Sequence, residues 1–508
     1  MQKLNFIDDF LNKITMYRLV LYGLIFLAVQ AIVFAFLGLL PFSGTQLLAE
    51  LLTLVFFCYL FNTIWGKVLH VALNVESANI TSLILFFILF PIFKPADVAP
   101  LILAAFIAMS SKYVLAINKK HMFNPAAIST VILGLLGIGA ATWWIGTLYM
   151  IPTTLVVGLL IVRKIRRFKL FFAFLISSIL SIAFTNIVQG TNLGEVFQQV
   201  LTSWPLFFFG TIMLTEPMTT PPTMMLQVFY GIIVGALFGT QFSFGPFYST
   251  PQLALVIGNI FSYVVGPKVR LVLTLAEKNE LASSVYQFVF KTTQKFTFQP
   301  GQYMEWTFPH AHPDSRGNRR YFTIASSPTE PDVKLGLKFY ENSSSYKKAL
   351  IEFKPGGMMV ASQLAGDFTL PKDKMQKLVF IAGGIGVTPF RSMIKYLSDL
   401  NEKRDIVLLF SNKVADEIVY KDIFEEAQQK LNLKVVYVID EGPTVPKDWK
   451  GHVGRITMDM IKAEVPDFME RTYYLSGPHG MVAAYQHILD DVGIQKNKIK
   501  SDFFPGFA

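Results

Sequence analysis

Long apolar stretches before residue 266 constrain the fold of this chain more than any other feature of its sequence. A helix needs about 20 apolar residues to cross the hydrocarbon core of a bilayer. Ten segments come near that length: 17–41, 47–66, 79–94, 99–117, 125–143, 145–162, 169–188, 196–214, 224–242 and 251–266. Of the 508 residues 52% are hydrophobic, more than a soluble protein of this length carries. Residues 1–266 are therefore predicted to form a polytopic α-helical domain with about ten spans in a lipid bilayer.

Basic residues at the ends of these segments predict the orientation of the domain. With the amino terminus in the cytoplasm, the basic residues on the inner side are Lys13, Arg18, Lys67, Lys112, Lys119, Lys120, the cluster at 163–169, Lys268 and Arg270. Lys94 alone then lies outside, which agrees with the positive-inside rule. We expect a multi-pass protein of the cell (inner) membrane with both termini and the soluble part in the cytoplasm. Because this pattern explains the net charge of +10, nucleic acid is not an expected partner.

Two polar stretches interrupt the apolar sequence, "NKKHMFNPAAIS" at 118–129 and "TEPMTTPPT" at 215–223, both on the predicted cytoplasmic side. One interpretation is that the prolines of these stretches only begin or end helices, because proline suits the first helical turn. Alternatively, interrupted helices with freed backbone groups line a cofactor or ion site. The candidate residues for such a site are Asn124, Pro125, Glu216, Thr219 and Thr220.

With the ten predicted spans, these stretches resemble the membrane family of the Rnf complex D subunit and the B subunit of the sodium-pumping NADH:quinone reductase (Nqr). "FNPA" at 123–126 matches the Rnf form, and "TEP" at 215–217 resembles the family's Thr-Asp-Pro. The resemblance implies flavin within the membrane and redox-driven ion movement. Family members usually attach FMN to a threonine at the position of Leu206, which has no hydroxyl. The expected membrane cofactor is therefore non-covalent FMN or riboflavin, or a quinone.

Acidic residues are few in this half, and two of them, Glu50 and Glu216, lie close to the apolar segments. A carboxylate within a membrane domain is a candidate for ion binding. The alternative is that each carboxylate caps a helix end in the headgroup layer.

The remainder of the chain alternates charged and apolar residues as soluble proteins do. Short strand-like segments over 268–372 predict a small antiparallel β-barrel. Alternating strands and helices over 377–508 predict a doubly wound parallel sheet. We therefore expect three domains, a membrane domain at 1–266, an FAD-type β-barrel at 267–373 and an NAD(P)-type α/β domain at 374–508.

A barrel followed by such a sheet resembles the ferredoxin–NADP reductase family, and "RYFT" at 320–323 looks like its Arg-x-Tyr-Ser/Thr flavin motif. By this match Arg320 faces the FAD pyrophosphate, Phe322 replaces the flavin-stacking tyrosine, and Thr323 lies near flavin N5. In "NSSSYKKAL" at 342–350 the serines replace the family's phosphate loop or form a solvated turn. Phe507, near the carboxyl terminus, covers the flavin or only anchors the chain end. The FAD candidates are Arg320, Tyr321, Phe322, Thr323, Ser344, Ser345 and Phe507.

"GGIGVTP" at 383–389 follows a predicted strand and opens a helix, where glycines let a backbone approach a nucleotide closely. "LSGPHGM" at 475–481 matches the family's Cys-Gly-Pro stretch, with Ser476 at the cysteine position. The NAD(P) candidates are Gly383, Gly384, Gly386, Thr388, Pro389, Ser476, Gly477 and Pro478. The resemblance implies FAD and either NADH or NADPH as cofactors, with Thr323 and Ser476 at the catalytic positions. With Cys58 as the sole cysteine, neither an iron–sulfur cluster nor another metal site is expected.

The sequence thus predicts an FAD-dependent NAD(P)H oxidoreductase that passes electrons to a flavin, quinone or other acceptor at the membrane domain. Whether ions move with the electrons is left open. One alternative is a transporter or anchor whose reductase-like module serves a separate redox protein. Another is a haem-containing transmembrane reductase, which needs paired histidines, whereas the membrane half has only His70 and His121.

Overall fold

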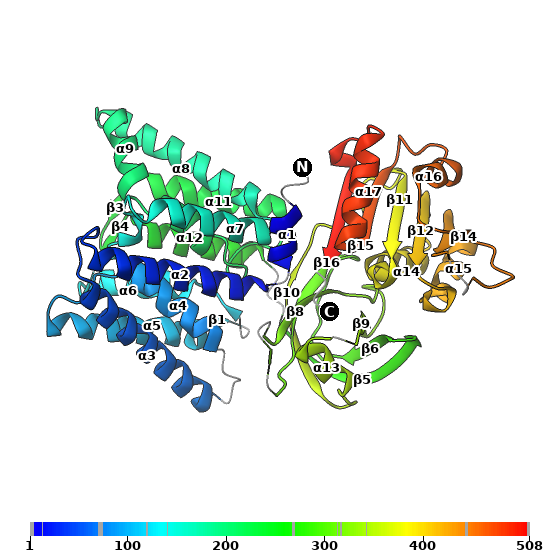
Figure 1. Cartoon of the computed structure of the whole chain (residues 1–508), viewed down its shortest axis with the longest axis horizontal. Coiled ribbons are helices and arrows are strands. Elements are labelled where there is room, and N and C mark those ends of the chain that lie inside the picture. Colours follow the sequence, from blue (N-terminus) through cyan, green and yellow to red (C-terminus); the bar gives the residue numbers. More distant parts are fainter. Residues whose placement is uncertain are drawn as a thin grey trace. The chain divides into compact units, whose positions relative to one another are not determined.

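The computed structural model of the chain describes residues 5–12, 14–69, 75–117, 120–139, 141–266, 270–311, 313–314, 317–341, 343–441 and 445–504. The chain divides into two compact units, Met1–Lys268 and Val269–Ala508. Helices dominate the first unit, and the second combines strands and helices (Figure 1).

The first unit contains twelve helices labelled α1 to α12 in its described residues. They are α1 (Asn5–Asn12), α2 (Met16–Phe36), α3 (Gly44–Val68), α4 (Val75–Ile88), α5 (Val98–Val114), α6 (Pro125–Leu135), α7 (Ile151–Lys164), α8 (Phe168–Val188), α9 (Leu193–Ser203), α10 (Leu206–Phe208), α11 (Met224–Gly239) and α12 (Pro251–Val265). Two short hairpins accompany them, β1 (Ala116–Ile117) with β2 (Lys120–His121), and β3 (Ser243–Phe244) with β4 (Phe247–Tyr248).

Each of the ten predicted apolar segments contains a helix, but the helices differ in length. Four of those described are long and apolar enough to cross a membrane: Met16–Phe36, Gly44–Val68, Pro95–Val114 and Phe168–Val188. Four shorter apolar helices are Val75–Ile88, Pro125–Leu135, Met224–Gly239 and Pro251–Val265. At a rise of about 1.5 Å per residue, the 11 residues of α6 cover only about 17 Å.

The segment predicted at 196–214 is not one helix. Helix α9 ends at Ser203, Trp204 is extended with ψ 148°, and the chain resumes after Pro205 as α10 and a π-helical turn at Phe209–Met213. The break has a local cause, because the residue before a proline avoids the α conformation and proline lacks an N–H.

Helices α8 and α11 approach each other unusually closely. Glycines recur at every fourth position of α11 over 231–239, and a Cβ on Gly235 would lie 2.5 Å from the carbonyl oxygen of Phe174. The hydroxyls of Ser177 and Ser181 on α8 donate to carbonyl oxygens of α11 at 2.8 and 2.7 Å. Small residues that permit such contact are typical of helix pairs in membranes.

The second unit begins with a six-stranded antiparallel sheet in the order β8-β7-β10-β5-β6-β9. Its strands are β5 (Arg270–Ala282), β6 (Val285–Lys291), β7 (Tyr303–Thr307), β8 (Arg319–Thr323), β9 (Val333–Lys338) and β10 (Met358–Ala365), with helix α13 at Ser345–Ile351. The edge strands β8 and β9 are joined by the loop at 324–332, where Ala325 N–H donates to the Lys334 carbonyl at 2.8 Å. Buried Phe288, Phe290 and Trp306 belong to the core of this sheet.

A six-stranded parallel sheet follows, in the order β14-β13-β12-β11-β15-β16. Its strands are β11 (Leu378–Gly383), β12 (Ile406–Asn412), β13 (Leu433–Ile439), β14 (His452–Val453), β15 (Thr472–Pro478) and β16 (Ile499–Phe504). The accompanying helices are α14 (Thr388–Asp399), α15 (Lys421–Lys430), α16 (Met458–Glu464) and α17 (His479–Asp491). The strand order reverses between β11 and β15, and nucleotides bind at the carboxyl edge of such a switch point. All six residues of β11 are buried, as a central parallel strand requires.

Candidate functional site

The two glycine-containing loops of the parallel sheet meet at its carboxyl edge. Strands β11 and β15 are direct neighbours, with Ala382 opposite Ser476. A Cβ on Gly386 would lie 2.5 Å from the Gly477 Cα and 2.7 Å from the Ser476 carbonyl oxygen, so only glycine fits there. A 3₁₀ turn at Gly384–Val387 separates the strand from α14. The structure therefore brings the predicted residues together: Gly383, Gly384, Gly386, Thr388 and Pro389 with Ser476, Gly477 and Pro478.

Four buried hydroxyls in this unit have no hydrogen-bond partner among the residues described, those of Thr323, Tyr420, Tyr437 and Ser476, and two of them belong to predicted site residues. Thr323, at the end of β8, is 2% exposed, and Ser476 on β15 is fully buried. Leaving a buried hydroxyl unsatisfied costs roughly 1–3 kcal/mol. Such groups in a native fold usually await a ligand or water. Thr323 and Ser476 are thus free to contact a ligand, and their placement beside a flavin and a nicotinamide stays a prediction.

Arg320 is buried and held by several contacts. It is 6% exposed, and its Nη1 donates to the carbonyl oxygens of Arg319 (2.7 Å) and Gly317 (3.2 Å). Its guanidinium lies 5.0 Å from the centre of the Tyr346 ring, and Nη2 lies 3.9 Å from a carboxylate oxygen of Asp314. A guanidinium fixed in this way is suited to a phosphate group.

One residue of the predicted serine loop, Ser345, contacts the same carboxylate. The backbone N–H of Ser345 donates to Asp314 Oδ2 at 3.0 Å, and the Asp314 N–H donates to Ser345 Oγ at 2.8 Å. Ser344 caps α13, where its Oγ accepts from the Lys347 N–H at 3.3 Å. The Ser345 N–H is thus paired with a carboxylate and the Ser344 hydroxyl with the start of α13, so the phosphate role of these two serines stays a prediction. Phe507 lies outside the described residues.

The two aromatic residues of "RYFT" lie on different faces of β8, because side chains alternate along a strand. Phe322 shares a face with Arg320, and its ring centre lies 6.1 Å from that of Tyr346. Tyr321 points the other way and donates its hydroxyl to Glu305 Oε2 at 2.9 Å. Phe322 is therefore better placed than Tyr321 to contact a flavin.

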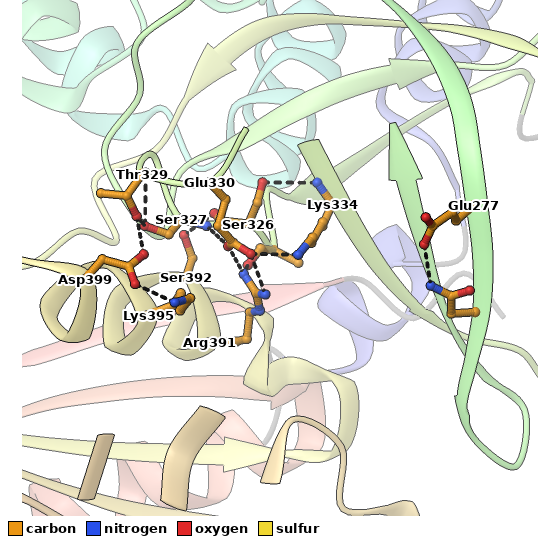
Figure 2. A network of polar contacts seen from close by, with 12 residues as sticks. Glu277, Ser326, Ser327, Thr329, Glu330, Lys334, Arg391, Ser392, Lys395 and Asp399 are labelled. Carbon is orange, nitrogen blue, oxygen red and sulfur yellow. Dashed lines mark hydrogen bonds and ion pairs between the residues drawn. The ribbon is translucent and has the colours of Figure 1, made fainter. Parts of the chain in front are cut away.

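A polar network that the sequence did not reveal ties the antiparallel sheet to the parallel one (Figure 2). Arg391 on α14 forms a two-pronged ion pair with Glu330, whose second contact, Nη2 to Oε1, measures 2.9 Å. Arg391 also donates to the Ala325 carbonyl at 3.0 Å, and Ser392 Oγ donates to the Ser326 carbonyl at 2.6 Å. The loop at 324–332, which contains Glu330, is thereby fastened to α14, the helix that begins within "GGIGVTP".

This ion pair is buried, and it changes the pKa of the Glu330 carboxyl. The side chains of Arg391 and Glu330 are 3% and 9% exposed. Burial alone would raise the pKa of the Glu330 carboxyl. Hydrogen bonds and charge from Arg391, with a Lys334 contact at 2.7 Å and the Ser327 N–H, outweigh burial and lower that pKa to about 2. Glu330 therefore stays ionised at neutral pH and holds Arg391 in place.

A second close contact between the sheets occurs at Gly336 in β9. A Cβ there would lie 2.7 Å from Tyr420 Oη and 2.9 Å from Thr388 Cγ2. Thr388 belongs to the predicted nucleotide loop, so β9 lies directly against that loop. Glycine within a strand often marks such a close approach, and this signal could have been read from the sequence.

In the helical unit, the two polar stretches meet. Asn124 Nδ2 donates to Glu216 Oε2 at 2.9 Å, although the residues are 92 positions apart. Thr219 Oγ1 donates to the same carboxylate oxygen at 3.2 Å, and Thr220 Oγ1 donates to the Glu216 carbonyl at 3.1 Å. We call Asn124, Glu216, Thr219 and Thr220 the membrane polar cluster, because the sequence predicts that this unit lies in a membrane. Pro125 is the first residue of α6, whose first N–H groups donate to the Asn124 side chain.

Three further residues contact this cluster. Arg167 belongs to the basic cluster at 163–169, which indicated only the orientation of the domain, and no motif pointed to Asn259 or Tyr230. Asn259 on α12 accepts from the Asn124 N–H at 2.9 Å and donates to Tyr230 Oη at 3.0 Å. Arg167 donates to Thr220 Oγ1 and to the Thr215 carbonyl, the latter at 2.9 Å. These contacts therefore connect the membrane polar cluster to α11, to α12 and to Arg167, the residue before α8.

Comparison with known proteins places the second unit in a class. The oxidoreductase NAD-binding domain family matches residues 380–487. The glycine betaine monooxygenase reductase subunit of Pseudomonas aeruginosa (strain UCBPP-PA14) is 26% identical over 223 residues, which is 43% of this chain and 60% of that protein. A subunit of the Na(+)-translocating NADH-quinone reductase of Yersinia pestis (strain Pestoides F) is 31% identical over 183 residues, 35% of this chain and 43% of the relative.

A solved flavohemoglobin from Malassezia yamatoensis with bound FAD and heme has a TM-score of 0.44 and 20% identity, covering 65% of this chain and 79% of that one. The chain spans about 60% of the length of the first curated relative. The second unit is thus a ferredoxin-reductase-like module, an oxidoreductase unit that uses FAD and NAD(P)H.

Proposed function

We propose that the chain is a membrane-bound NAD(P)H oxidoreductase whose second unit delivers electrons to a flavin or quinone at the membrane polar cluster. When bound, FAD would supply the redox chemistry, taking a hydride from the nicotinamide and releasing electrons singly. One relative is named as part of an NADH-quinone reductase, which favours a quinone as acceptor. Fusion of the two units in one chain keeps donor and acceptor at a high effective concentration.

The observation that carries this proposal is the hydrogen bond between Asn124 and Glu216, at 2.9 Å. It joins two polar stretches from distant parts of an apolar helical unit. A buried polar cluster of this kind is expensive in a membrane domain and is normally kept for function. In the second unit, Arg320 would hold the FAD phosphate, and Thr323 and Ser476 would contact the flavin and the nicotinamide.

We also propose the finer assignments that follow from this function. The helical unit would cross the membrane about ten times by the length argument, with both termini and the redox module cytoplasmic. The boundary between the FAD and NAD(P) domains would lie near residue 373, between β10 and β11. The module-only alternative, in which electrons go to a separate redox protein, is favoured by the relative named as a monooxygenase reductase subunit.

Asn124→Ala and Glu216→Ala test the proposal in the full-length protein. Each should leave reduction of FAD by NAD(P)H nearly unchanged, because that step uses residues of the second unit. Each should slow reoxidation by membrane quinone, measured by stopped-flow absorbance. Glu195→Ala is the matched control, since Glu195 lies on α9 and contacts Asn192 rather than the cluster, at 3.2 Å. Unchanged reoxidation in both cluster variants would favour the module-only alternative.

A further inference from the structure

One buried acidic residue lies apart from the membrane polar cluster. Glu50, on α3, is fully buried, and neither carboxylate oxygen has a hydrogen-bond partner in the described parts of the chain. The buried residues of α3 recur every three or four positions, at Leu47, Glu50, Leu54, Cys58 and Asn62. Glu50 therefore lies on the stripe that faces the interior of the helical unit. An ionised carboxylate there, without a partner, would be strongly destabilising.

A second polar side chain lies at the same depth on the neighbouring helix. A Cβ on Gly44 would lie 2.3 Å from the Phe36 ring, so the end of α2 and the start of α3 are side by side. Gln30 is six residues before Phe36, and Glu50 is six residues after Gly44, so each lies about 9 Å from its helix end. The amide oxygen of Gln30 is also buried without a described partner.

Charged groups on the helices packed against α3 do not neutralise Glu50. No described ion pair includes it. The charged side chains of α2, α4, α5 and α3 itself lie at the helix ends away from Gly44: Arg18, Glu76, Lys112 and Lys67. At the Gly44 end, Asp97 Oδ2 accepts the N–H groups of Phe93 and Lys94 at 3.0 and 2.9 Å.

We propose that Glu50 is a proton-binding site, a neutral carboxylic acid that exchanges its proton with the water phase at the Gly44 side of the helical unit. A hard metal cation would need several oxygen ligands. The described residues contain no group of three His, Cys, Asp or Glu side chains that could hold a metal. A proton needs only one carboxylate oxygen. This inference goes beyond the proposed electron transfer and does not depend on it.

Dicyclohexylcarbodiimide tests the site, because this apolar reagent adds to protonated carboxyl groups in membranes. Full-length protein in liposomes would be treated over a range of pH, and peptides would be analysed by mass spectrometry. Glu50 should be modified, and its modification should fall as the pH rises. Glu50→Gln should lose the adduct at this position and retain reduction of FAD by NADH. Glu195, on α9, provides an accessible carboxylate for comparison.

Several results would overturn the inference. Absence of modification at Glu50 across the pH range would show that the carboxyl is not a proton carrier open to the membrane. Equal modification of Glu195 would show that labelling reports accessibility alone. Protection of Glu50 by Na⁺ but not by choline would show that a metal cation binds there instead. If Glu50→Gln folds poorly, the pH dependence of Glu50 modification in the wild-type protein still tests the inference.

Discussion

Arg320 carries the most direct prediction at the scale of single residues. Its guanidinium is fixed by two backbone carbonyls at 2.7 and 3.2 Å and is suited to the FAD phosphate. Arg320→Ala should weaken FAD binding about 10- to 100-fold, the loss expected when a charge-assisted hydrogen bond of about 1.5–3 kcal/mol is removed. The loss of FAD from each variant would be measured by the fluorescence of the flavin released during dialysis.

The neighbouring Arg319 supplies the control for this experiment. It lies on the other face of β8, with Nη1 3.5 Å from Glu305 Oε1. Arg319→Ala should retain FAD as the parent does. Equal retention in the Arg320 variant would show that the flavin motif is misassigned.

The Glu330–Arg391 pair carries a second prediction, for stability and pH. Because folding lowers the pKa of Glu330 from its ordinary 4.5 to about 2, the pair stabilises the second unit above pH 4.5. That stabilisation should be lost as the pH falls from 4.5 towards 2. Arg391→Met removes the two-pronged partner of buried Glu330, which keeps its Lys334 contact at 2.7 Å, and should lower the free energy of unfolding by up to about 3–5 kcal/mol. Denaturant unfolding at neutral and acid pH would measure both effects.

A double-mutant cycle separates the pair from its surroundings. Glu330→Gln combined with Arg391→Met should destabilise less than the sum of the two single changes. Additive losses, or an unaltered acid profile in Glu330→Gln, would contradict the role given to this ion pair.

At the scale of elements, the contact between the two glycine loops determines the third prediction. Gly386→Ala places a Cβ 2.5 Å from the Gly477 Cα and should push β11 and β15 apart at the nucleotide edge. We expect a lower rate of FAD reduction at low NADH concentration, with FAD content unchanged. Stopped-flow reduction measures the rate, and absorbance measures the FAD content.

Gly480→Ala is the matched control, since a Cβ on Gly480 meets no atom within 4 Å. It should reduce FAD at the parent rate. If Gly386→Ala is equally active at low NADH, the loop contact does not position the nucleotide.

Local motifs explain why much of the second unit could be predicted. "GGIGVTP" contains its own strand end, turn and helix start, so its sequence determines its structure within a few residues. The Glu330–Arg391 pair could not be predicted, because its members are 61 residues apart and meet only when the two sheets pack. The break at Pro205 was readable from the sequence, but a long apolar run obscured it.

In the helical unit, too, contacts between residues far apart in the sequence could be predicted only in part. Charge counting placed Asn124 and Glu216 on one side of the membrane, and the structure brings them within hydrogen-bond distance at 2.9 Å. Asn259 joins them from α12 without a recognisable motif. Short helices such as α4 end inside the unit, where the Ile88 carbonyl accepts the Thr142 N–H at 2.8 Å. Such satisfaction of freed backbone groups depends on tertiary packing.

In the whole molecule, both units should be needed for electron transfer to the membrane. The two compact units meet in sequence at Lys268 and Val269, so residues 269–508 can be tested as a separate protein. Alone, this module should bind FAD and be reduced by NADH as fast as the full-length protein. It lacks the membrane polar cluster and should therefore pass electrons to quinone slowly.

The rate at which membrane quinone reoxidises the reduced flavin distinguishes an electron-accepting helical unit from an anchor. Full-length protein and the 269–508 module would each be mixed with quinone-containing liposomes after reduction by NADH, and flavin absorbance would be followed by stopped flow. We predict reoxidation at least about tenfold faster in the full-length protein, because its acceptor site is tethered to the donor. Equal rates for the two proteins would contradict the account and reduce the helical unit to an anchor.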